Sequence, residues 1–282
     1  HSWKLSAFYF FFFAIVGGTA PFLPLYLASL DYDAIAVGQL MAILMLTKMV
    51  APNFWGWIAD QSGRRLALVR MGGIFSSVFF IGFIIAEGFW AHVFFLVMFS
   101  CFWNAVLPQW EVITLFNLGT ERNRYSRIRL WGSVGFIAAV TGLGWFFEFF
   151  AIDWLVYWLL PCLAFGLLAL VTVLVQHQPS LEKMGSFAGF IALLKDQNIV
   201  IFFILAFLLQ LSFGPYYTFL SLYLEDLGYS KIAIGLFWAA GVAAEVILFL
   251  IMHRLIKTFS LKLIVLVCLV LTSARWFGIG NF

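Results

Sequence analysis

The stretch Gly17–Gly38, GGTAPFLPLYLASLDYDAIAVG, occurs a second time in the chain as Gly214–Gly235, GPYYTFLSLYLEDLGYSKIAIG. The two stretches align without a gap at an offset of 197 residues, and eleven of their 22 positions are identical. Apolar composition alone gives chance matches of Leu and Phe, but it does not readily give matched Gly, Tyr-Leu and Ile-Ala pairs in one register. The chain therefore contains an internal repeat, and a repeat of this kind organises a whole fold.

The composition places the repeat in a membrane. Of the 282 residues, 64% are hydrophobic and 10% are charged, whereas a soluble domain carries about 25% charged residues. A helix crosses the hydrocarbon core in roughly 20 residues, and the apolar runs have about this length without the alternation of a barrel strand. The sequence predicts an all-α membrane protein with nine apolar segments, at 6–29, 36–58, 67–87, 89–118, 130–150, 154–176, 199–224, 232–252 and 261–280.

Charged residues between the segments predict the orientation. Basic residues gather in alternate connections: Lys4; Arg64, Arg65 and Arg70; Arg122, Arg124, Arg127 and Arg129; Lys183 and Lys195; Arg254, Lys257 and Lys262. The other connections hold Lys231 among acidic residues: Asp31, Asp33, Glu87, Glu148, Asp153, Glu225 and Asp226. The positive-inside rule predicts a multi-pass protein of a bacterial-type inner membrane, with its N-terminus and central linker in the cytoplasm.

The repeat also predicts the domain plan. Six segments separate its two copies, so both copies cross the membrane in the same direction. We therefore expect two parallel six-helix bundles, with residues 1–176 as the first, 177–198 as a cytoplasmic linker and 199–282 as part of the second. The second bundle contains three segments here, so we expect a chain truncated after about nine transmembrane helices. Transporters with this plan bind substrate between their halves, near the midplane.

A loop motif carries a family resemblance. Residues Gly56–Arg65, GWIADQSGRR, match the G-x-x-x-D-x-x-G-R-R signature of the major facilitator superfamily, in the loop where that family has it. Glycines allow close approach, and Asp60 can accept charge-assisted hydrogen bonds from arginines. The resemblance implies a cytoplasmic gating loop of Gly56, Asp60, Gly63, Arg64 and Arg65. The alternative is a basic topogenic loop with an incidental aspartate.

The whole chain resembles one branch of that superfamily, the phenylpropionate permeases, near the oligosaccharide and nucleoside proton symporters. The stretches that carry this resemblance are Gly17–Tyr26, Thr47-Lys48, Pro52 before Trp55-Gly56, and Arg127–Gly135. The resemblance implies uptake of an aromatic acid together with a proton.

Two charged residues lie within predicted spans at equivalent positions. Lys48 and Glu245 are separated by 197 residues, the offset of the repeat. A charge at a helix centre costs about 2.5–3.5 kcal/mol on insertion scales, so each is a candidate functional residue. Facing each other across a cavity, they could bind a carboxylate and a proton. The alternative is a structural salt bridge between the bundles.

Further candidates come from the resemblance to the lactose permease family, which has a carboxylate on helix four, an arginine at the start of helix five and an aromatic residue beyond it. Here these are Glu111, Arg129 and Phe136, and Asn104 shares the helix face of Glu111. A phenylalanine in place of that family's tryptophan suits an aromatic substrate better than a sugar. The alternative for Arg129 is the last basic residue of a topogenic loop.

The same family has an intramembrane arginine on helix nine that takes part in proton coupling, and Arg275 lies in the ninth segment here. In the seventh segment, Gln210 and Tyr217 share one helix face and predict a cavity stripe. The alternative for that stripe is hydrogen bonding between packed helices.

Other classes of function are disfavoured. The sequence contains no G-x-S-x-G elbow, no phosphate loop and no His/Cys cluster with metal spacing, so we expect no enzyme activity, cofactor or metal. Cys101, Cys162 and Cys268 lie in apolar runs, which disfavours disulfides. The basic residues are spread over short loops, so nucleic acid is not an expected partner. The expected partners are a small substrate, a proton and the bilayer, and we expect a monomer.

Together these features predict a secondary transporter that works by alternating access, most simply as a proton symporter of an aromatic carboxylate such as phenylpropionate. Three alternatives stay open: a sugar or nucleoside proton symporter, an uncoupled exporter of the same fold, and a membrane scaffold that does not transport.

Overall fold

The computed structural model describes residues 2–119, 124–172 and 197–281, and the elements in these ranges are helical. The α-helices are α1 (Ser2–Ser29), α2 (Ala34–Ser62), α3 (Arg65–Ile85), α4 (Phe89–Leu118), α5 (Tyr125–Phe149), α6 (Leu155–Thr172), α8 (Gln197–Asp226), α9 (Lys231–Thr258) and α10 (Leu261–Gly280), with a 3-10 turn, η2, at Ile152–Trp154. Each predicted apolar segment corresponds to one of these helices. By length and composition, eight can cross a membrane, and Ile152–Leu168 is a shorter apolar helix. The predicted all-α membrane fold is confirmed.

The two copies of the repeat begin their second helix in the same way. At the start of α2, the Asp33 carboxylate accepts a hydrogen bond from the Ala36 N–H at 2.8 Å. At the start of α9, the Ser230 hydroxyl accepts one from the Ala233 N–H at 3.2 Å. A short polar side chain at this position satisfies a backbone donor that the helix itself cannot. The repeat therefore conserves the function of the cap although the residues differ.

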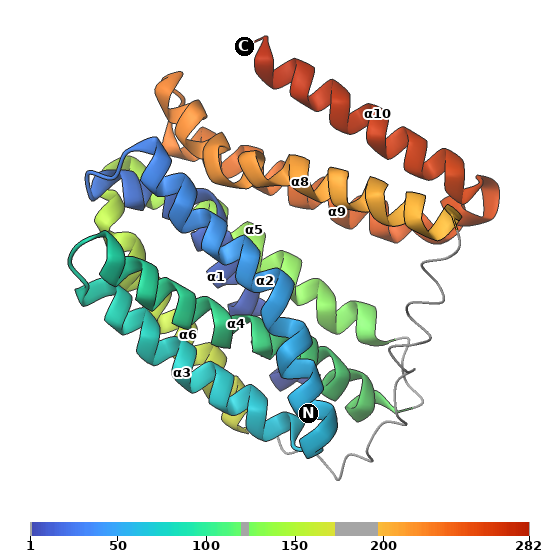
Figure 1. Cartoon of the computed structure of the whole chain (residues 1–282), viewed down its shortest axis with the longest axis horizontal. Coiled ribbons are helices and arrows are strands. Elements are labelled where there is room, and N and C mark those ends of the chain that lie inside the picture. The colour runs from blue at the N-terminus through green and yellow to red at the C-terminus, as the bar shows by residue number, and fades with distance from the viewer. Residues whose placement is uncertain (1, 120–123, 173–196, 282) are drawn as a thin grey trace.

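Successive helices run back and forth between two ends of the molecule (Figure 1). One end contains the start of α1 and the α2–α3, α4–α5 and α9–α10 connections, and we call it the basic end because the loop arginines lie there. The other contains the α1–α2, α3–α4, α5–α6 and α8–α9 connections, and we call it the acidic end. This alternation is the arrangement that the positive-inside pattern requires.

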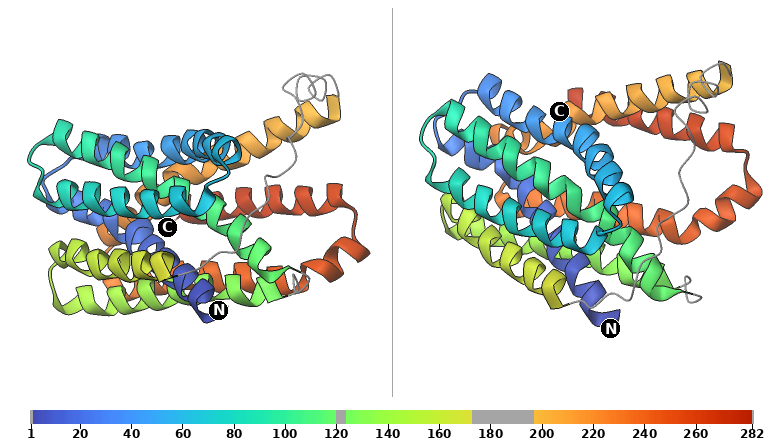
Figure 2. Two further views of the ribbon diagram at one scale, coloured as in Figure 1. Left: turned by 90° about the horizontal axis from the view of Figure 1, so that it is seen from below. Right: turned by 60° about the horizontal axis from the view of Figure 1, so that its bottom comes forward.

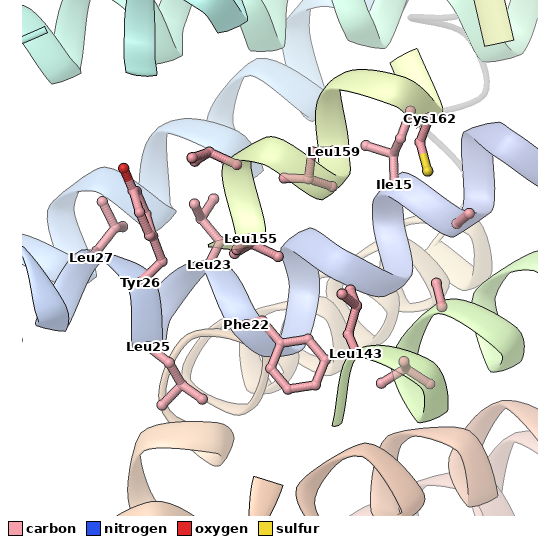
Figure 3. Close-up of a cluster of buried hydrophobic side chains, with 14 of the residues drawn as sticks. Ile15, Phe22, Leu23, Leu25, Tyr26, Leu27, Leu143, Leu155, Leu159 and Cys162 are labelled. Atoms are coloured by element: carbon pink, nitrogen blue, oxygen red, sulfur yellow. The ribbon is translucent and has the colours of Figure 1, made fainter. Parts of the chain in front are cut away.

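The first half packs around α1. This helix lies against α5 and α6, while α4 packs on α2 and α3. Figure 3 shows Phe22 and Leu23 of α1 in the same apolar cluster as Leu143 of α5 and Leu155 of α6. A Cβ atom at Gly17 would lie 2.7 Å from the Phe136 carbonyl oxygen, so α1 and α5 approach more closely than any larger residue allows.

The second half is joined to the first mainly through α9 against α5 and α8 against α1 and α2. The contacts concentrate toward the acidic end, and Figure 2 shows α8 and α9 diverging from the first half toward the other end. Apolar side chains along α8 and α10 are exposed, as expected for helices that face lipid or further protein. Most of the predicted linker, residues 177–196, lies outside the described residues, and the domain boundaries stay a prediction.

Candidate functional site

The gating-loop residues form a compact network between three helices. Gly63 ends α2 with a backbone φ of 64°, a left-handed conformation that glycine adopts without strain. Arg65, at the start of α3, pairs with Asp60 and donates to the Gln109 side chain of α4. Arg65 is only 8% exposed.

Two further residues of the same motif, Arg64 and Gly56, lie beside this network. The Arg64 N–H donates to the Ser62 hydroxyl at 3.3 Å. A Cβ atom at Gly56 would lie 3.7 Å from the Gln109 amide nitrogen, so this glycine faces the same network. The motif therefore ties the adjoining ends of α2 and α3 to α4, and the gating role stays a prediction.

Two of the predicted binding residues lie together in the first half. The Arg129 Nε is 3.5 Å from Glu111 Oε1. The guanidinium also lies over two rings of α1, with its carbon 4.2 Å from the centre of Phe13 and 5.5 Å from that of Tyr9. We call Glu111, Arg129, Tyr9 and Phe13 the first-half arginine site. It combines a cation, a carboxylate and two aromatic faces.

A glycine makes room for this site. A Cβ atom at Gly132 would lie 2.7 Å from Phe13 Cδ2 and 3.0 Å from Arg129 Nη1. Gly132 lies one helix turn after Arg129, and the arginine side chain runs along α5 toward it and over the ring of Phe13. The absence of a side chain at position 132 is therefore part of the geometry that holds Arg129.

Sequence analysis did not find the residues of α1 and the first turn of α5 that complete this site. The Tyr9 hydroxyl donates to Thr114 of α4 at 3.5 Å, and Tyr9 is fully buried. Tyr125 interacts with both Tyr9 and Glu111. The available signal was that Tyr9 is the one tyrosine in the aromatic run Phe8–Phe13, with Phe13 four residues later on the same helix face.

Other predicted residues of the first half are placed differently. The Asn104 amide donates to the Ser100 carbonyl at 2.8 Å and lies 3.5 Å from the Thr47 hydroxyl, so it joins α4 to α2. Phe136 is 6% exposed and packs in the core that contains α1. In this conformation its ring faces other protein side chains, and stacking on a substrate stays a prediction.

The equivalent charges do not pair directly. Lys48 of α2 and Glu245 of α9 are both exposed, and no ion pair joins them within the described part of the chain. Glu245 instead lies within electrostatic range of Tyr217 on α8. The alternative of a direct salt bridge between Lys48 and Glu245 is therefore not observed in the described part of the chain, and a role for either residue in binding substrate or a proton stays a prediction.

Of the predicted residues of the second half, Tyr217 lies within electrostatic range of both Arg275 and Glu245, whereas Gln210 is exposed. The Arg275 guanidinium carbon lies 4.5 Å from the ring centre of Tyr216 and 4.8 Å from that of Phe213. The Tyr217 ring lies 5.5 Å from that of Trp238, whose indole N–H donates to the Ser221 hydroxyl at 3.0 Å.

These features define a class of protein. The described residues contain eight apolar helices long enough to cross a membrane, and the sequence contains an internal repeat at an offset of 197 residues and the loop motif Gly56–Arg65. These are features of a multi-pass membrane transporter of the major facilitator type. A model of the MFS_1-like family matches residues 2–282, and the chain belongs to this family. The resemblance inferred from the loop motif is thereby confirmed.

The names of individual relatives differ in the substrate that they state. The chain is 26% identical to "Maltose permease" of Geobacillus stearothermophilus over 95% of its own length and 68% of that protein. It is 27% identical to "Probable 3-phenylpropionic acid transporter" of Escherichia coli (strain K12), over 95% of its length and 71% of that protein. The crystal structure of the nucleoside transporter NupG, as a D323A mutant, matches with a TM-score of 0.79 at 18% identity, covering 91% of this chain and 68% of that one. The chain thus spans about two thirds of these relatives, and the structural match supports the fold.

Proposed function

We propose that this protein is a secondary active transporter that carries a small organic substrate across a bacterial-type inner membrane with a proton. An aromatic carboxylate is the favoured substrate. Family membership supports transport, and the basic loops support a cytoplasmic N-terminus and linker. The two halves alternate between conformations that open to opposite sides of the membrane.

The first-half arginine site carries this proposal. Glu111 and Arg129 have side chains that are 36% and 33% exposed, so the pair is neither sealed in the core nor fully in water. When Glu111 is ionised, it competes with any anion for the guanidinium. When Glu111 takes up a proton, Arg129 becomes available to a substrate carboxylate. Substrate and proton then bind together, and the complex has the same net charge as the empty site.

The contact between the halves supports the alternating-access part. A Cβ atom at Gly144 of α5 would lie 2.7 Å from the Lys231 carbonyl oxygen, and one at Gly235 of α9 would lie 2.5 Å from the Val140 carbonyl oxygen. Near the same contact, Glu148 accepts a hydrogen bond from the Lys231 N–H at 3.1 Å. The halves are therefore closed together at the acidic end. If the basic end is cytoplasmic, this conformation faces inward.

A sugar or nucleoside symporter is the second candidate, because relatives carry the names "Maltose permease" and "Putative nucleoside transporter YegT". Arginine and carboxylate side chains also hydrogen-bond hydroxyl groups. An uncoupled exporter and a scaffold are the remaining candidates.

The decisive experiment measures the uptake of labelled aromatic acids, disaccharides and nucleosides into proteoliposomes. The proteoliposomes contain the protein in the form in which cells produce it. Symport predicts accumulation driven by an imposed proton gradient and abolished by a protonophore. Uptake that is indifferent to the gradient would contradict coupling. A scaffold would show no uptake, and its function would be unaffected by the double substitution Lys48→Met and Glu245→Gln. A transporter would lose substrate uptake in the same double variant.

A further inference from the structure

The guanidinium of Arg275 lies among three aromatic rings. Its carbon is 4.5 Å from the ring centre of Tyr216, 4.8 Å from that of Phe213 and 5.6 Å from that of Trp276. Phe213 and Tyr216 belong to α8, one helix turn apart, whereas Trp276 follows Arg275 on α10. Rings stabilise a guanidinium by lying over its flat faces, and they offer nothing to its N–H groups, which point outward in the plane.

Two nitrogen atoms of Arg275 have no hydrogen-bond partner among the described residues. Nε and Nη2 of Arg275 are buried and make no hydrogen bond to any residue that the structure describes. Of the acidic side chains in this half, Glu225 pairs with Lys231. Glu245 lies within electrostatic range of Tyr217, as Arg275 does, but no ion pair joins Glu245 to Arg275 within the described residues. A buried charged donor without an acceptor is costly, and native structures rarely keep one without a functional reason.

The identity of the two nitrogens defines the missing group. Nε and Nη2 lie on one edge of the guanidinium and point their hydrogens in nearly the same direction. A carboxylate matches this edge with two parallel hydrogen bonds, and a single hydroxyl or carbonyl oxygen does not. The occupant that fits is therefore a planar anion with two oxygens on one carbon.

The surroundings define the remainder of the ligand. The Tyr216 ring is 5.7 Å from that of Tyr217, and both rings lie 5.5 Å from that of Trp238. These rings form a continuous aromatic cluster between Arg275 and α9, in which Trp238 is buried. A flat ring next to a carboxylate would contact it by stacking or edge-to-face packing.

We propose that Arg275 and the rings of Phe213, Tyr216, Tyr217 and Trp238 form a binding site for an aromatic monocarboxylate, in which Nε and Nη2 of Arg275 bind the carboxylate. The proposal rests on the transport function above and names the residues of the second half that select the substrate. The Arg275 nitrogens are occluded in this conformation, so the carboxylate enters when the aromatic side chains around them move apart. Substrate binding then stabilises a different arrangement of the halves, which is the requirement for a ligand to drive a conformational change.

The test compares the binding of a phenylalkanoic acid with that of its primary amide, which has the same shape but no charge. Dissociation constants are measured by calorimetry on the detergent-solubilised protein as cells make it. We expect the acid to bind at least about tenfold more tightly than the amide, because a charge-assisted pair of hydrogen bonds is lost with the amide. In Arg275→Gln this preference should approach one. Arg275→Lys keeps the charge but loses the two parallel N–H donors, so the preference for the acid should fall to an intermediate value.

The matched control is Lys257→Gln, which removes an exposed positive charge at the end of α9 and should keep the full preference for the acid. A melting temperature for each variant shows whether it is folded. An unchanged acid-to-amide ratio in folded Arg275→Gln would overturn the proposal, as would a preference that disappears with Arg129→Gln and persists with Arg275→Gln. If the protein transports sugars or nucleosides and binds neither ligand, the inference fails and the transport function stands. If it transports nothing, the proposed function itself fails.

Discussion

Each half of the molecule places one arginine against aromatic rings of its own first helix, and the two arginines differ in what meets their N–H groups. Arg129 lies over Tyr9 and Phe13 of α1, and Glu111 is 3.5 Å from its Nε. Arg275 lies over Phe213 and Tyr216 of α8, and its Nε has no partner within the described residues.

The difference separates two uses of the same side chain. Aromatic faces hold a guanidinium in place without neutralising it, so the net charge of the site depends on the group at the edge. In the first half that group is the carboxylate of Glu111, which belongs to the protein. In the second half no such group lies among the described residues, and we propose that a ligand supplies it. A carrier that couples a proton to an anion needs both kinds of site.

The largest effect should come from filling the space that positions Arg129. In Gly132→Leu, the new side chain would collide with Phe13 and Arg129 and move the guanidinium off its ring. We expect uptake to fall by more than about 100-fold, because a displaced binding group loses both its charge pair and its orientation. Initial uptake rates in proteoliposomes measure this.

Gly142 on the same helix supplies the control for that variant. A Cβ atom there meets nothing within 4 Å, so Gly142→Leu should change uptake by less than about twofold. Equal losses in the two variants would show that α5 tolerates no larger residue in general, and would remove the argument for Arg129.

The two arginines should affect stability in opposite directions. Arg275→Met removes a buried donor that lacks a partner, and relief of that cost is worth about 1–3 kcal/mol. Arg129→Met leaves Glu111 without its cation. For a chain of this size we expect Arg275→Met to raise the melting temperature in detergent by roughly 2–6 °C and Arg129→Met to lower it.

Thermal unfolding without ligand and with a phenylalkanoic acid sharpens this contrast. The acid should stabilise the wild-type protein and leave Arg275→Met unchanged, because the variant has lost the edge that binds a carboxylate. A lower melting temperature for ligand-free Arg275→Met would show that Arg275 already has a stabilising partner, and the comparison between the two halves would then fail.

A smaller effect is expected from the Glu111–Arg129 pair itself. Both side chains are about one third exposed, so solvent screens their attraction, and a double-mutant cycle with Glu111→Gln and Arg129→Gln should give a coupling of about 0.2–1 kcal/mol in stability. In each of these variants, uptake should fall by a larger factor than a coupling energy of this size corresponds to. A coupling well above 1 kcal/mol, with uptake preserved in the double variant, would make the pair structural.

The sequence predicted the helices well because their signals are local. Apolar runs of membrane length, the cap residues Asp33 and Ser230, and the offset of 197 residues can all be read without knowing which helices touch. The charge pair Glu111–Arg129 was also accessible, through the resemblance to a family with the same two positions on helices four and five. These features lie within one element or within one known pattern.

The remaining features depend on how helices rotate and pack. Periodicity could not show that Phe136 turns into the core, because the residues around it on α5, Val134–Val140, are all apolar. The repeat placed Lys48 and Glu245 at equivalent positions, but equivalence fixes neither distance nor orientation, and the two do not pair. Tyr9 differs from the phenylalanines around it, and Phe13 lies on its helix face, but nothing in that aromatic run shows which helix this face meets.

The smallest expected effect concerns the place where the two halves meet. Glu148 of α5 accepts the Lys231 N–H at the start of α9, where the helix dipole favours a negative charge by about 0.3–1 kcal/mol. Glu148→Gln keeps the size and removes the charge, so it should loosen the closed acidic end without abolishing it. The readout is the alkylation rate of a cysteine introduced at Ile232, beside the Gly144 contact, and it should rise by about two- to fivefold.

Glu87→Gln, in another connection at the same end, removes an exposed charge away from α9 and should leave the rate unchanged. A rate that responds equally to both variants would mean that net charge at this end, and not the cap on α9, holds the halves together. A rate that responds only to Glu148→Gln would show that the first half closes the acidic end through a carboxylate on the backbone of the second, a contact that must break each time the carrier turns over.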